Sequence, residues 1–142
     1  MSGSLHQATC VAIGSAGNQR ALLIEGPPGS GKSSLALALI DRGAILVGDD
    51  GVELSLQEGQ LWAAPPSNTA GLLEIRNVGI VKVPCTTAPA ALVIRLDGNA
   101  PRYVETPESI ELHGLALPLI RLWPDSPALA LRAEAALRLH GT

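Results

Sequence analysis

One glycine-rich segment constrains the fold of this chain more than any other feature. Residues 26–33, Gly-Pro-Pro-Gly-Ser-Gly-Lys-Ser, match the pattern G-x-x-x-x-G-K-[ST] at every position. In that pattern the backbone N–H groups turn toward phosphate oxygens, the lysine reaches the β- and γ-phosphates, and the final hydroxyl binds Mg²⁺. The motif requires a strand before it and a helix after it, and the apolar patterns at 21–24 and 33–42 indicate both. The sequence therefore predicts a nucleotide-binding phosphate loop formed by Gly26, Pro27, Pro28, Gly29, Ser30, Gly31, Lys32 and Ser33.

Two acidic residues follow the next predicted strand. The apolar run at 44–47 leads through Gly48 to Asp49 and Asp50, sixteen residues after Ser33. A carboxylate at a strand end beside a phosphate loop is the usual partner of Mg²⁺, and a second carboxylate can accept a proton from an attacking hydroxyl. An acidic turn that opens the following hairpin would use the same residues. The position of the pair directly after a strand–loop–helix–strand unit favours the functional interpretation, and leaves open which acid does which task.

The rest of the chain is rich in predicted strands. Apolar and alternating patterns indicate them at 6–13, 52–56, 61–64, 78–83, 91–96 and 115–122. The last strand contains Pro118, which suits a sheet edge. An Ala- and Leu-rich helix is predicted at 128–139. One helical crossover among so many strands predicts a small mixed α/β domain with a strand-rich body, not a doubly wound sheet.

The composition narrows the class of protein. At 142 residues we expect a single domain over 1–142, and 46% apolar against 16% charged residues exclude a disordered chain. A net charge of −3 provides no broad basic face for nucleic acid. Without a long apolar run or a leader-like start, we expect a cytoplasmic protein with no membrane partner. Cys10 and Cys85 form no CxxC pair and are predicted to be reduced thiols in or near strands.

Several separated segments resemble the HPr kinase/phosphorylase family. The phosphate loop, the apolar helix at 35–40, Arg42-Gly43 and the strand ending in Asp-Asp at 46–50 occur in the order and spacing of that family. The stretch 71–80 is similar to its Glu-Ile/Val-Arg-Gly-x-Gly-Ile signature, and Leu5-His6 resembles the histidine before its first core strand. The resemblance covers most of residues 5–120.

The resemblance implies a fold and an activity. The fold is a phosphate-loop-containing, strand-rich mixed sheet of the HPr kinase / phosphoenolpyruvate carboxykinase-like type. The activity is a serine kinase and phosphorylase that acts on the phosphocarrier protein HPr and regulates a bacterial phosphotransferase system. The implied donor is ATP, or by family analogy pyrophosphate, with Mg²⁺, and the implied assembly is a hexamer.

The resemblance also implies roles for individual residues. Asp49 would be the base that activates the serine, which leaves Asp50 as the acid for the metal. Ser33 and Glu74 would hold Mg²⁺, and Lys32 and His6 would contact phosphate. Arg76 would lie in the catalytic signature segment, and Arg102 would complete the site. Arg95 competes with Arg102, but its place within a strand predicts a side chain that faces solvent. Glu74 and Arg76 could instead form an ion pair on one strand face.

Three departures from the family pattern bear on the activity. Full-length members carry an additional N-terminal domain, so the chain resembles the catalytic core alone. Asn77 stands where the family usually has glycine, and asparagine also tolerates unusual backbone angles. The segment 118–125 is a shortened form of the longer Pro-Val-x-x-Gly-Arg-Asn region that is tied to dephosphorylation and subunit contacts. Kinase activity is therefore favoured over phosphorylase activity.

Two other classes of function use the same loop. A small-metabolite kinase usually closes an arginine-bearing lid over its substrate, whereas only Arg95, Arg102 and Arg121 lie between Arg76 and the last predicted helix, with no lid-like insertion. A nucleotide-sensing module would bind ATP without turnover, but the polar groups needed for phosphoryl transfer are all present. Both alternatives are less favoured than a kinase with an open site for a protein substrate.

Overall fold

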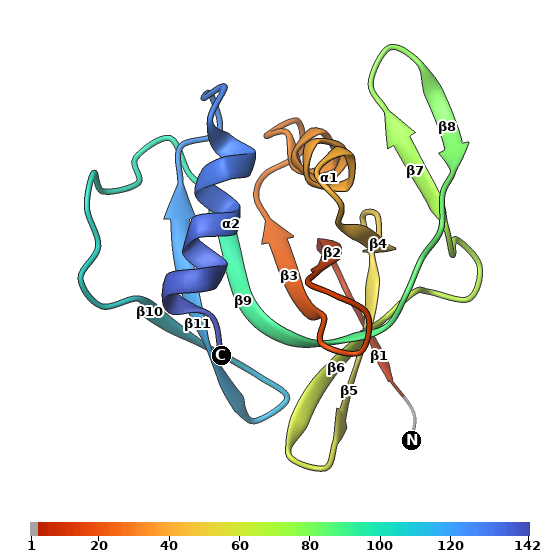
Figure 1. The fold of residues 1–142 in the computed structure, drawn as a ribbon, viewed down its shortest axis with the longest axis horizontal. Helices are drawn as coiled ribbons and strands as arrows, with labels where there is room; N and C mark the ends of the chain where they lie inside the picture. The colour runs from red at the N-terminus through yellow and green to blue at the C-terminus, as the bar shows by residue number, and fades with distance from the viewer. Residues whose placement is uncertain (1–2) are drawn as a thin grey trace.

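The computed structural model describes residues 3–142. This part of the chain forms eleven strands and two helices, one helix after β3 and one after β11 (Figure 1). The elements are β1 (Ser4–His6), β2 (Thr9–Ile13), β3 (Arg20–Glu25), α1 (Lys32–Asp41), β4 (Ile45–Gly48), β5 (Val52–Gln57), β6 (Gln60–Ala64), β7 (Leu72–Ile75), β8 (Gly79–Lys82), β9 (Ala88–Leu96), β10 (Glu108–Leu112), β11 (Leu115–Leu122) and α2 (Leu129–His140). The strand-rich mixed α/β fold expected from the sequence is confirmed.

Nine of these strands form one curled sheet in the order β1-β5-β6-β9-β3-β2-β4, with β11 beside β9 and β10 beside β11. β3 and β11 both run parallel to β9. β4 also runs in the direction of β3, because both pair antiparallel with β2 between them. The carboxyl ends of β3, β4, β9 and β11 therefore lie at one edge of the sheet, where sites of open α/β sheets usually form.

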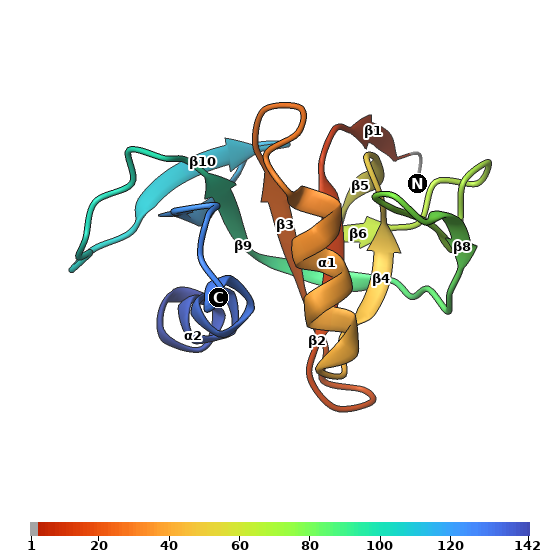
Figure 2. The ribbon, with the colours of Figure 1, turned by 90° about the horizontal axis from the view of Figure 1, so that it is seen from above.

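The central strands are buried on both faces, as the apolar run at 21–24 predicts. In β3, Leu22 and Ile24 belong to the core beneath the helices, whereas Ala21 and Leu23 belong to a second core beneath β5 and β6. Both helices contribute to the first core and so cover the same face of the sheet (Figure 2). The period of two along a strand places alternate residues in different cores.

The helix after the phosphate loop begins and ends where local chemistry predicts. α1 starts directly after Gly31, whose φ of 101° lies in the left-handed region that favours glycine. It buries Leu35, Ala36 and Leu39 against the sheet. At its other end the N–H of Gly43 donates to the carbonyl of Ile40. The bounds of α1 agree with the predicted helix at 33–42 to within one residue.

The structure differs from the sequence-based prediction in four strands. The predicted strand at 6–13 is divided into β1, which pairs with β5, and β2, which pairs with β3 and β4, because the chain crosses between two parts of the sheet. The expectation that Pro118 marks an edge is wrong, since β11 lies between β9 and β10. Pairing with β9 begins at Leu119, so the missing N–H of Pro118 interrupts no bond there. Neither β7 nor β10 was predicted.

A separate hairpin stands away from the sheet. β7 and β8 pair only with each other within the described residues, and they project from the body of the molecule (Figure 1). Asn77 in the turn adopts a φ of 68°, so this position does require a residue that tolerates the left-handed region. Asparagine can therefore adopt the left-handed backbone conformation at the position where the family usually has glycine.

Two further sequence-based expectations concern the thiols and membrane spans. Cys10 and Cys85 are not joined in a disulfide; the first is buried in β2 and the second is exposed. Burial raises the pKa of the Cys10 thiol far above its ordinary value. Neither helix within residues 3–142 combines the length and the hydropathy that crossing a membrane demands.

Candidate active site

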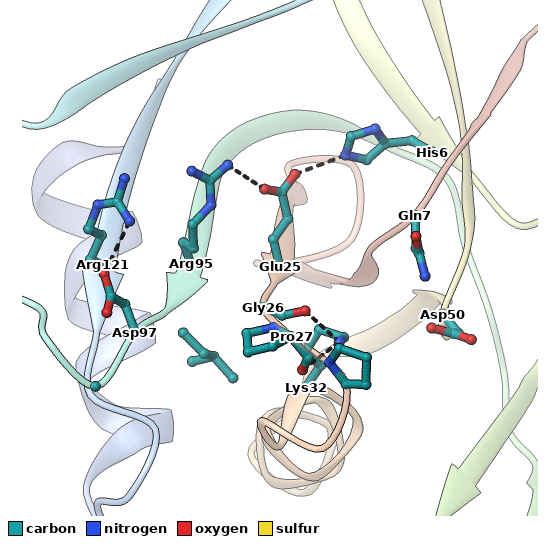
Figure 3. Close-up of a pocket in the computed structure, with 13 residues that line it drawn as sticks. His6, Gln7, Glu25, Gly26, Pro27, Lys32, Asp50, Arg95, Asp97 and Arg121 are labelled. Carbon is teal, nitrogen blue, oxygen red and sulfur yellow. Dashed lines mark hydrogen bonds and ion pairs between the residues drawn. The ribbon is translucent and has the colours of Figure 1, made fainter.

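A cavity of about 860 Å³ lies at the edge of the sheet where the parallel strands end (Figure 3). We call it the phosphate-loop cavity. It is lined from β1 to β11 by His6, Gln7, Glu25, Gly26, Pro27, Pro28, Lys32, Asp50, Arg95, Leu96, Asp97, Gly98 and Arg121. Its volume is in the range of ordinary small-ligand sites. The structure therefore brings the phosphate loop, one of the two acids and the N-terminal histidine around a single space.

The phosphate loop is folded onto its own lysine. Lys32 Nζ donates to the carbonyl oxygens of Gly26 at 2.8 Å and Pro27 at 3.2 Å, which holds the ammonium group at the loop (Figure 3). Gly26 permits a close approach, because a Cβ there would lie 2.6 Å from Ser30 Oγ. That hydroxyl is buried and finds no partner among the described residues. A buried hydroxyl and an ammonium group held by neutral carbonyls are donors suited to phosphate oxygens.

The first acid of the pair is fixed by three donors. Asp49 Oδ1 accepts hydrogen bonds from Ser33 Oγ at 2.6 Å and from Thr9 Oγ1 at 3.3 Å, and Oδ2 accepts one from the backbone N–H of Glu74 at 3.0 Å. Asp50 has a φ of 63° and an exposed side chain that lines the cavity. The structure thus places the hydroxyl of the loop and the carboxylate after β4 in direct contact.

The oxygen donors at this point suit a nucleotide-bound Mg²⁺. Mg²⁺ prefers oxygen ligands and is usually held by one or two protein groups together with substrate phosphates and water. Ser33 and the two acids provide such oxygens. Within residues 3–142 no group of three or more His, Cys, Asp or Glu side chains is arranged as a metal cage.

One carboxylate organises the opposite wall of the cavity. Glu25, directly before the phosphate loop, accepts a hydrogen bond from His6 Nε2 at 2.9 Å on Oε2 and one from Arg95 Nη2 at 2.8 Å on Oε1 (Figure 3). These contacts, with that of His6 contributing most, lower the pKa of Glu25 despite its burial. The pairing follows from strand register, because Glu25 lies opposite Arg95 in the parallel ladder of β3 and β9.

A second cluster of charged side chains, formed by Arg121, Asp97 and Glu108, lies beside Arg95 where β11 pairs with β9. Arg121 in β11 lies opposite Arg95, and it donates to Asp97 at 3.1 Å and to Glu108 at 2.7 Å. The backbone N–H of Asn99 contributes most to lowering the pKa of Asp97, and Arg121 lowers it further. The ion pairs Glu25–Arg95 and Asp97–Arg121 therefore line the cavity at the carboxyl ends of β3, β9 and β11.

Not every predicted site residue reaches this cavity. Arg102 lines a separate cavity of about 290 Å³ with Arg121, Trp123 and Arg132. The expectation that Arg95 faces solvent is wrong, because β3 and β11 flank β9 and its side chain meets Glu25. The structure thus places Arg95, and not Arg102, beside the phosphate loop.

The signature hairpin contributes differently from the prediction. Glu74 contacts Asp49 through its backbone N–H, and its side chain is exposed on β7. Arg76 is exposed in the turn beyond β7, and no ion pair joins it to Glu74 in the described part of the chain. The turn begins before Arg76, so the two side chains do not share a strand face as a continuous strand would require.

Sequence reasoning missed the roles of Glu25 and Asp97. Each is a charged residue at the carboxyl end of a buried strand, which is the signal that drew attention to Asp49 and Asp50. Applied to every strand in turn, the same rule would have found both. It could not have paired Glu25 with Arg95, because that pairing depends on strand order.

The fold and the cavity define a phosphate-loop α/β protein, and comparisons identify its family. The family model for the HPr Serine kinase C-terminal domain matches residues 5–87, which is more than half of the chain. The chain belongs to this family. The solved structure of the Hpr(Ser) kinase/phosphatase from Coxiella burnetii is similar with a TM-score of 0.83 at 29% identity, over 96% of this chain and 90% of that chain.

Curated relatives agree with this assignment over part of their length. An HPr kinase/phosphorylase from Clostridium tetani is 49% identical over 63 residues, which make up 44% of this chain and 21% of that protein. One from Streptococcus thermophilus is 39% identical over 115 residues, or 71% of this chain and 37% of that protein. The chain therefore spans little more than a third of these relatives at most.

Proposed function

We propose that this chain is an ATP-dependent serine kinase whose substrate is the phosphocarrier protein HPr. One observation carries the proposal: Ser33 Oγ of the phosphate loop donates a hydrogen bond to Asp49 Oδ1 of the acid pair at 2.6 Å. This contact supports phosphoryl transfer, because a carboxylate that can take a proton lies beside the hydroxyl that would bind the metal of the nucleotide. The names of the relatives and of the similar solved structure support the same substrate.

The positive groups of the cavity would bind and orient the phosphates. Lys32 would exchange its two carbonyl partners for the β- and γ-phosphates, and the imidazole of His6 would contact the transferred group. Arg95, held by Glu25 in the wall of the cavity, would complete the positive charge. Phosphoryl transfer depends mainly on such positioning and charge neutralisation.

Ser33 and Asp50 would hold Mg²⁺, with Glu74 as the third protein ligand implied by the family resemblance. When bound, the ion neutralises charge on the β- and γ-phosphates. The Asp50 carboxylate lines the phosphate-loop cavity and forms no ion pair with any of the described residues. Asp50 can therefore face the phosphates while Asp49 remains beside Ser33.

Asp49 would act as the base. It accepts the proton of the substrate serine while the serine oxygen bonds to the γ-phosphorus and the bond from that phosphorus to the β-phosphate oxygen breaks, which releases ADP. Its three hydrogen bonds hold the carboxylate in one position, as a general base requires. In phosphorolysis the same group would return the proton as inorganic phosphate attacks.

Intact-mass spectrometry of the host HPr tests the proposal. After incubation with this chain, ATP and Mg²⁺, we expect one added phosphate that is stable to acid and localised to serine. Adding inorganic phosphate then tests reversal. Tight ATP binding without phosphate transfer would contradict the kinase assignment and would favour a small-metabolite kinase or a nucleotide-sensing module.

An Asp49→Ala variant tests the role of the base. If Asp49 accepts the proton, phosphoryl transfer collapses while ATP affinity, measured by calorimetry with Mg²⁺, stays within about twofold. Asp41→Ala, in the last turn of α1, is the matched control. A parallel loss of Mg²⁺-ATP affinity in Asp49→Ala would assign this carboxylate to the metal instead.

The same proposal includes the hexamer implied by the family resemblance. Val78 and Ile80 on the projecting hairpin are 73% and 69% exposed, and a neighbouring copy could cover them. Sedimentation velocity measures the assembly directly. A monomer at micromolar concentration would contradict the hexamer without affecting the kinase assignment.

A further inference from the structure

A cavity of about 530 Å³ lies at the edge of the sheet where the parallel strands begin, opposite the edge that carries the phosphate loop. It is lined by the first residues of β3, β9 and β11, by the start of β6 and by the turn before β3. We call it the Trp62 cavity. We propose that it binds a small carboxylate with a flat apolar body, whose carboxylate pairs with Arg20 and whose body packs on Trp62. This inference does not depend on the proposed kinase function.

The order of the strands explains why this space stays open. β6 and β11 both pair with the edge of β9 that faces away from β3. β6 pairs with residues 88–89 of β9, and β11 begins to pair only at Val93, so no described strand pairs with residues 90–92 on that edge. The hairpin turns before β6 and before β11 lie at the same end of the molecule (Figure 1). Ala90 and Ala91, in the uncovered stretch of β9, line the cavity.

The apolar wall of the cavity belongs to the packed interior of the protein. Leu61 and Leu117 are 1% and 2% exposed and pack in the core beneath β5 and β6. Three further lining residues, Ala90, Ala91 and Ala116, have short side chains that leave the space unfilled. Close-packed residues keep their positions when a ligand arrives. The cavity is therefore preformed for an apolar group, as most small-ligand sites are.

Trp62 provides a flat apolar surface in this wall. Its side chain is half-buried on β6, opposite Pro89 in the antiparallel ladder with β9. The other tryptophan, Trp123, donates its indole N–H to the carbonyl of Ala100 at 2.7 Å, whereas the indole N–H of Trp62 donates to no group within residues 3–142. A half-buried indole with a free N–H favours a ligand whose flat body packs on the ring and whose polar group lies at its edge.

Arg20 determines the charge of the ligand. Among the described residues it is the only charged side chain that lines the cavity, and it forms no ion pair there. Its Nη1 donates to the main-chain oxygen of Thr142 at 3.2 Å, which leaves its other N–H donors free within residues 3–142. The planar guanidinium group matches the two oxygens of a carboxylate. One guanidinium balances one negative charge, so a carboxylate suits this cavity better than a doubly charged phosphate.

The Trp62 cavity is separate from the phosphate-loop cavity. No described residue lines both of them. Arg20 begins β3 and Glu25 ends it, so five steps of roughly 3.3 Å place these residues about 17 Å apart. A ligand in the Trp62 cavity therefore leaves the phosphate loop open to a nucleotide, and the two can bind at the same time.

Titration of the natural chain with phenylacetate tests the proposal, because this probe joins one carboxylate to a flat apolar ring. The indole N–H groups of Trp62 and Trp123, the two tryptophans of the chain, give separate NMR signals that single Trp→Phe variants assign. We expect phenylacetate to shift the Trp62 signal with a Kd of about 1 mM, as suits about ten non-hydrogen atoms, and to leave the Trp123 signal unchanged. Phenylacetamide, the neutral analogue, should bind at least about tenfold more weakly.

Two variants separate the charge of the cavity from its shape. Arg20→Gln should weaken phenylacetate at least about tenfold, with little effect on phenylacetamide, and should leave the melting temperature and the affinity for ATP essentially unchanged. Arg138→Gln, exposed in the last turn of α2, is the matched control and should bind phenylacetate like the natural chain. Ala116→Leu, at an exposed position of β11, places a larger side chain at the cavity and should weaken both probes alike.

Four results would overturn the assignment. In the first, the Trp62 signal does not respond to phenylacetate up to about 50 mM. In the second, Arg20→Gln binds phenylacetate as tightly as Arg138→Gln does. In the third, the natural chain binds phenylacetamide as tightly as phenylacetate, which would mean that the carboxylate makes no contact of its own. In the fourth, phenylacetate competes with ATP, which would place the probe in the phosphate-loop cavity. None of these results bears on the kinase assignment, which the transfer of phosphate to HPr tests separately.

Discussion

The phosphate-loop cavity lies beside a second cavity, the acid-pair groove, which is lined by Leu5, Asp49, Asp50, Glu53 and Pro66. The two differ in how many of their charged side chains form ion pairs. In the cavity, Glu25 bonds to His6 and Arg95, and Asp97 bonds to Arg121. Lys32 is held by two carbonyl groups. In the groove, Asp50 and Glu53 take part in no ion pair among the described residues.

The pairing of charged side chains affects how each cavity can bind a ligand. Most charged side chains of the phosphate-loop cavity are paired within the protein, so they are ordered before the ligand arrives and little is lost when a ligand of constant shape binds. A groove with uncompensated carboxylates leaves part of its electrostatic energy to be gained from a partner. The first arrangement suits a ligand of fixed shape such as a nucleotide.

The largest effect on catalysis is expected when the phosphate-loop cavity loses the ammonium group of Lys32. Lys32→Ala should lower kcat/KM for HPr phosphorylation by roughly 10²–10³-fold, because the ammonium group would no longer neutralise the β- and γ-phosphates. Lys82, exposed on β8, is the only other lysine and offers a matched control. A Lys32→Ala variant as active as Lys82→Ala would refute the role of the phosphate loop in transfer.

A smaller effect should distinguish the two candidate arginines. Arg95→Ala should lower kcat by about 10–100-fold, because it removes a positive charge from the cavity wall. Arg102→Ala, at the separate cavity, should change kcat by less than about twofold. Steady-state assays at saturating ATP and HPr make the comparison. The opposite ranking would mean that the loop after β9 brings Arg102 to the substrate during turnover.

A more modest loss is expected when the organising carboxylate is neutralised. Glu25→Gln should lower kcat by about tenfold, because His6 and Arg95 lose their common acceptor while the backbone remains intact. The pKa of Glu25 is lowered below its ordinary value of 4.5 by folding. Its contribution to stability is therefore complete above that value and is lost as the pH falls through the folded-state pKa.

The pH dependence provides an independent readout for Glu25. Melting temperatures of the natural chain and of Glu25→Gln, measured from pH 7 to pH 3, should differ most at neutral pH and converge in acid. Glu105→Gln, in the loop before β10, is the control and should follow the natural curve. A constant difference between Glu25→Gln and the natural chain across this range would show that ionisation of Glu25 is irrelevant.

The smallest effect is expected in the hairpin, away from the charges of both cavities. Asn77→Gly should change the free energy of unfolding by less than about 1 kcal/mol, because glycine accepts the φ of 68° but makes the unfolded chain more flexible. Asn77→Val should destabilise by about 1–2 kcal/mol, since a β-branched residue resists this region. Denaturant melts compare the two, and equal stabilities would mean that the hairpin relaxes.

The features that sequence predicted best are local ones. The phosphate loop, the strand before it, α1 and the acids after β4 all depend on patterns within residues 21–50, and the structure places them together. The left-handed position of Asn77 is likewise local, because the turn that requires it closes within a few residues. Backbone sterics and short-range hydrogen bonds act over these distances, so the chain itself carries the information.

The features that sequence could not predict depend on which strands become neighbours. Arg95 lies within a strand and looks solvent-facing until β3 places Glu25 opposite it. Pro118 looks like an edge residue until β10 pairs with β11. The predicted strand at 6–13 is divided because β5 pairs with its first part and β3 with its second.

The sequence by itself therefore determined the chemistry available to this protein: a loop for phosphate, two acids after a strand, and a family signature in the right order. Tertiary structure alone decided how the charges are shared. It placed the carboxyl ends of four strands at one edge, paired Glu25 with Arg95, and put Leu5 and His6 on different sides of the acid pair. The physical reason is that strand order and register arise from burying apolar faces across the whole domain, which no local pattern specifies.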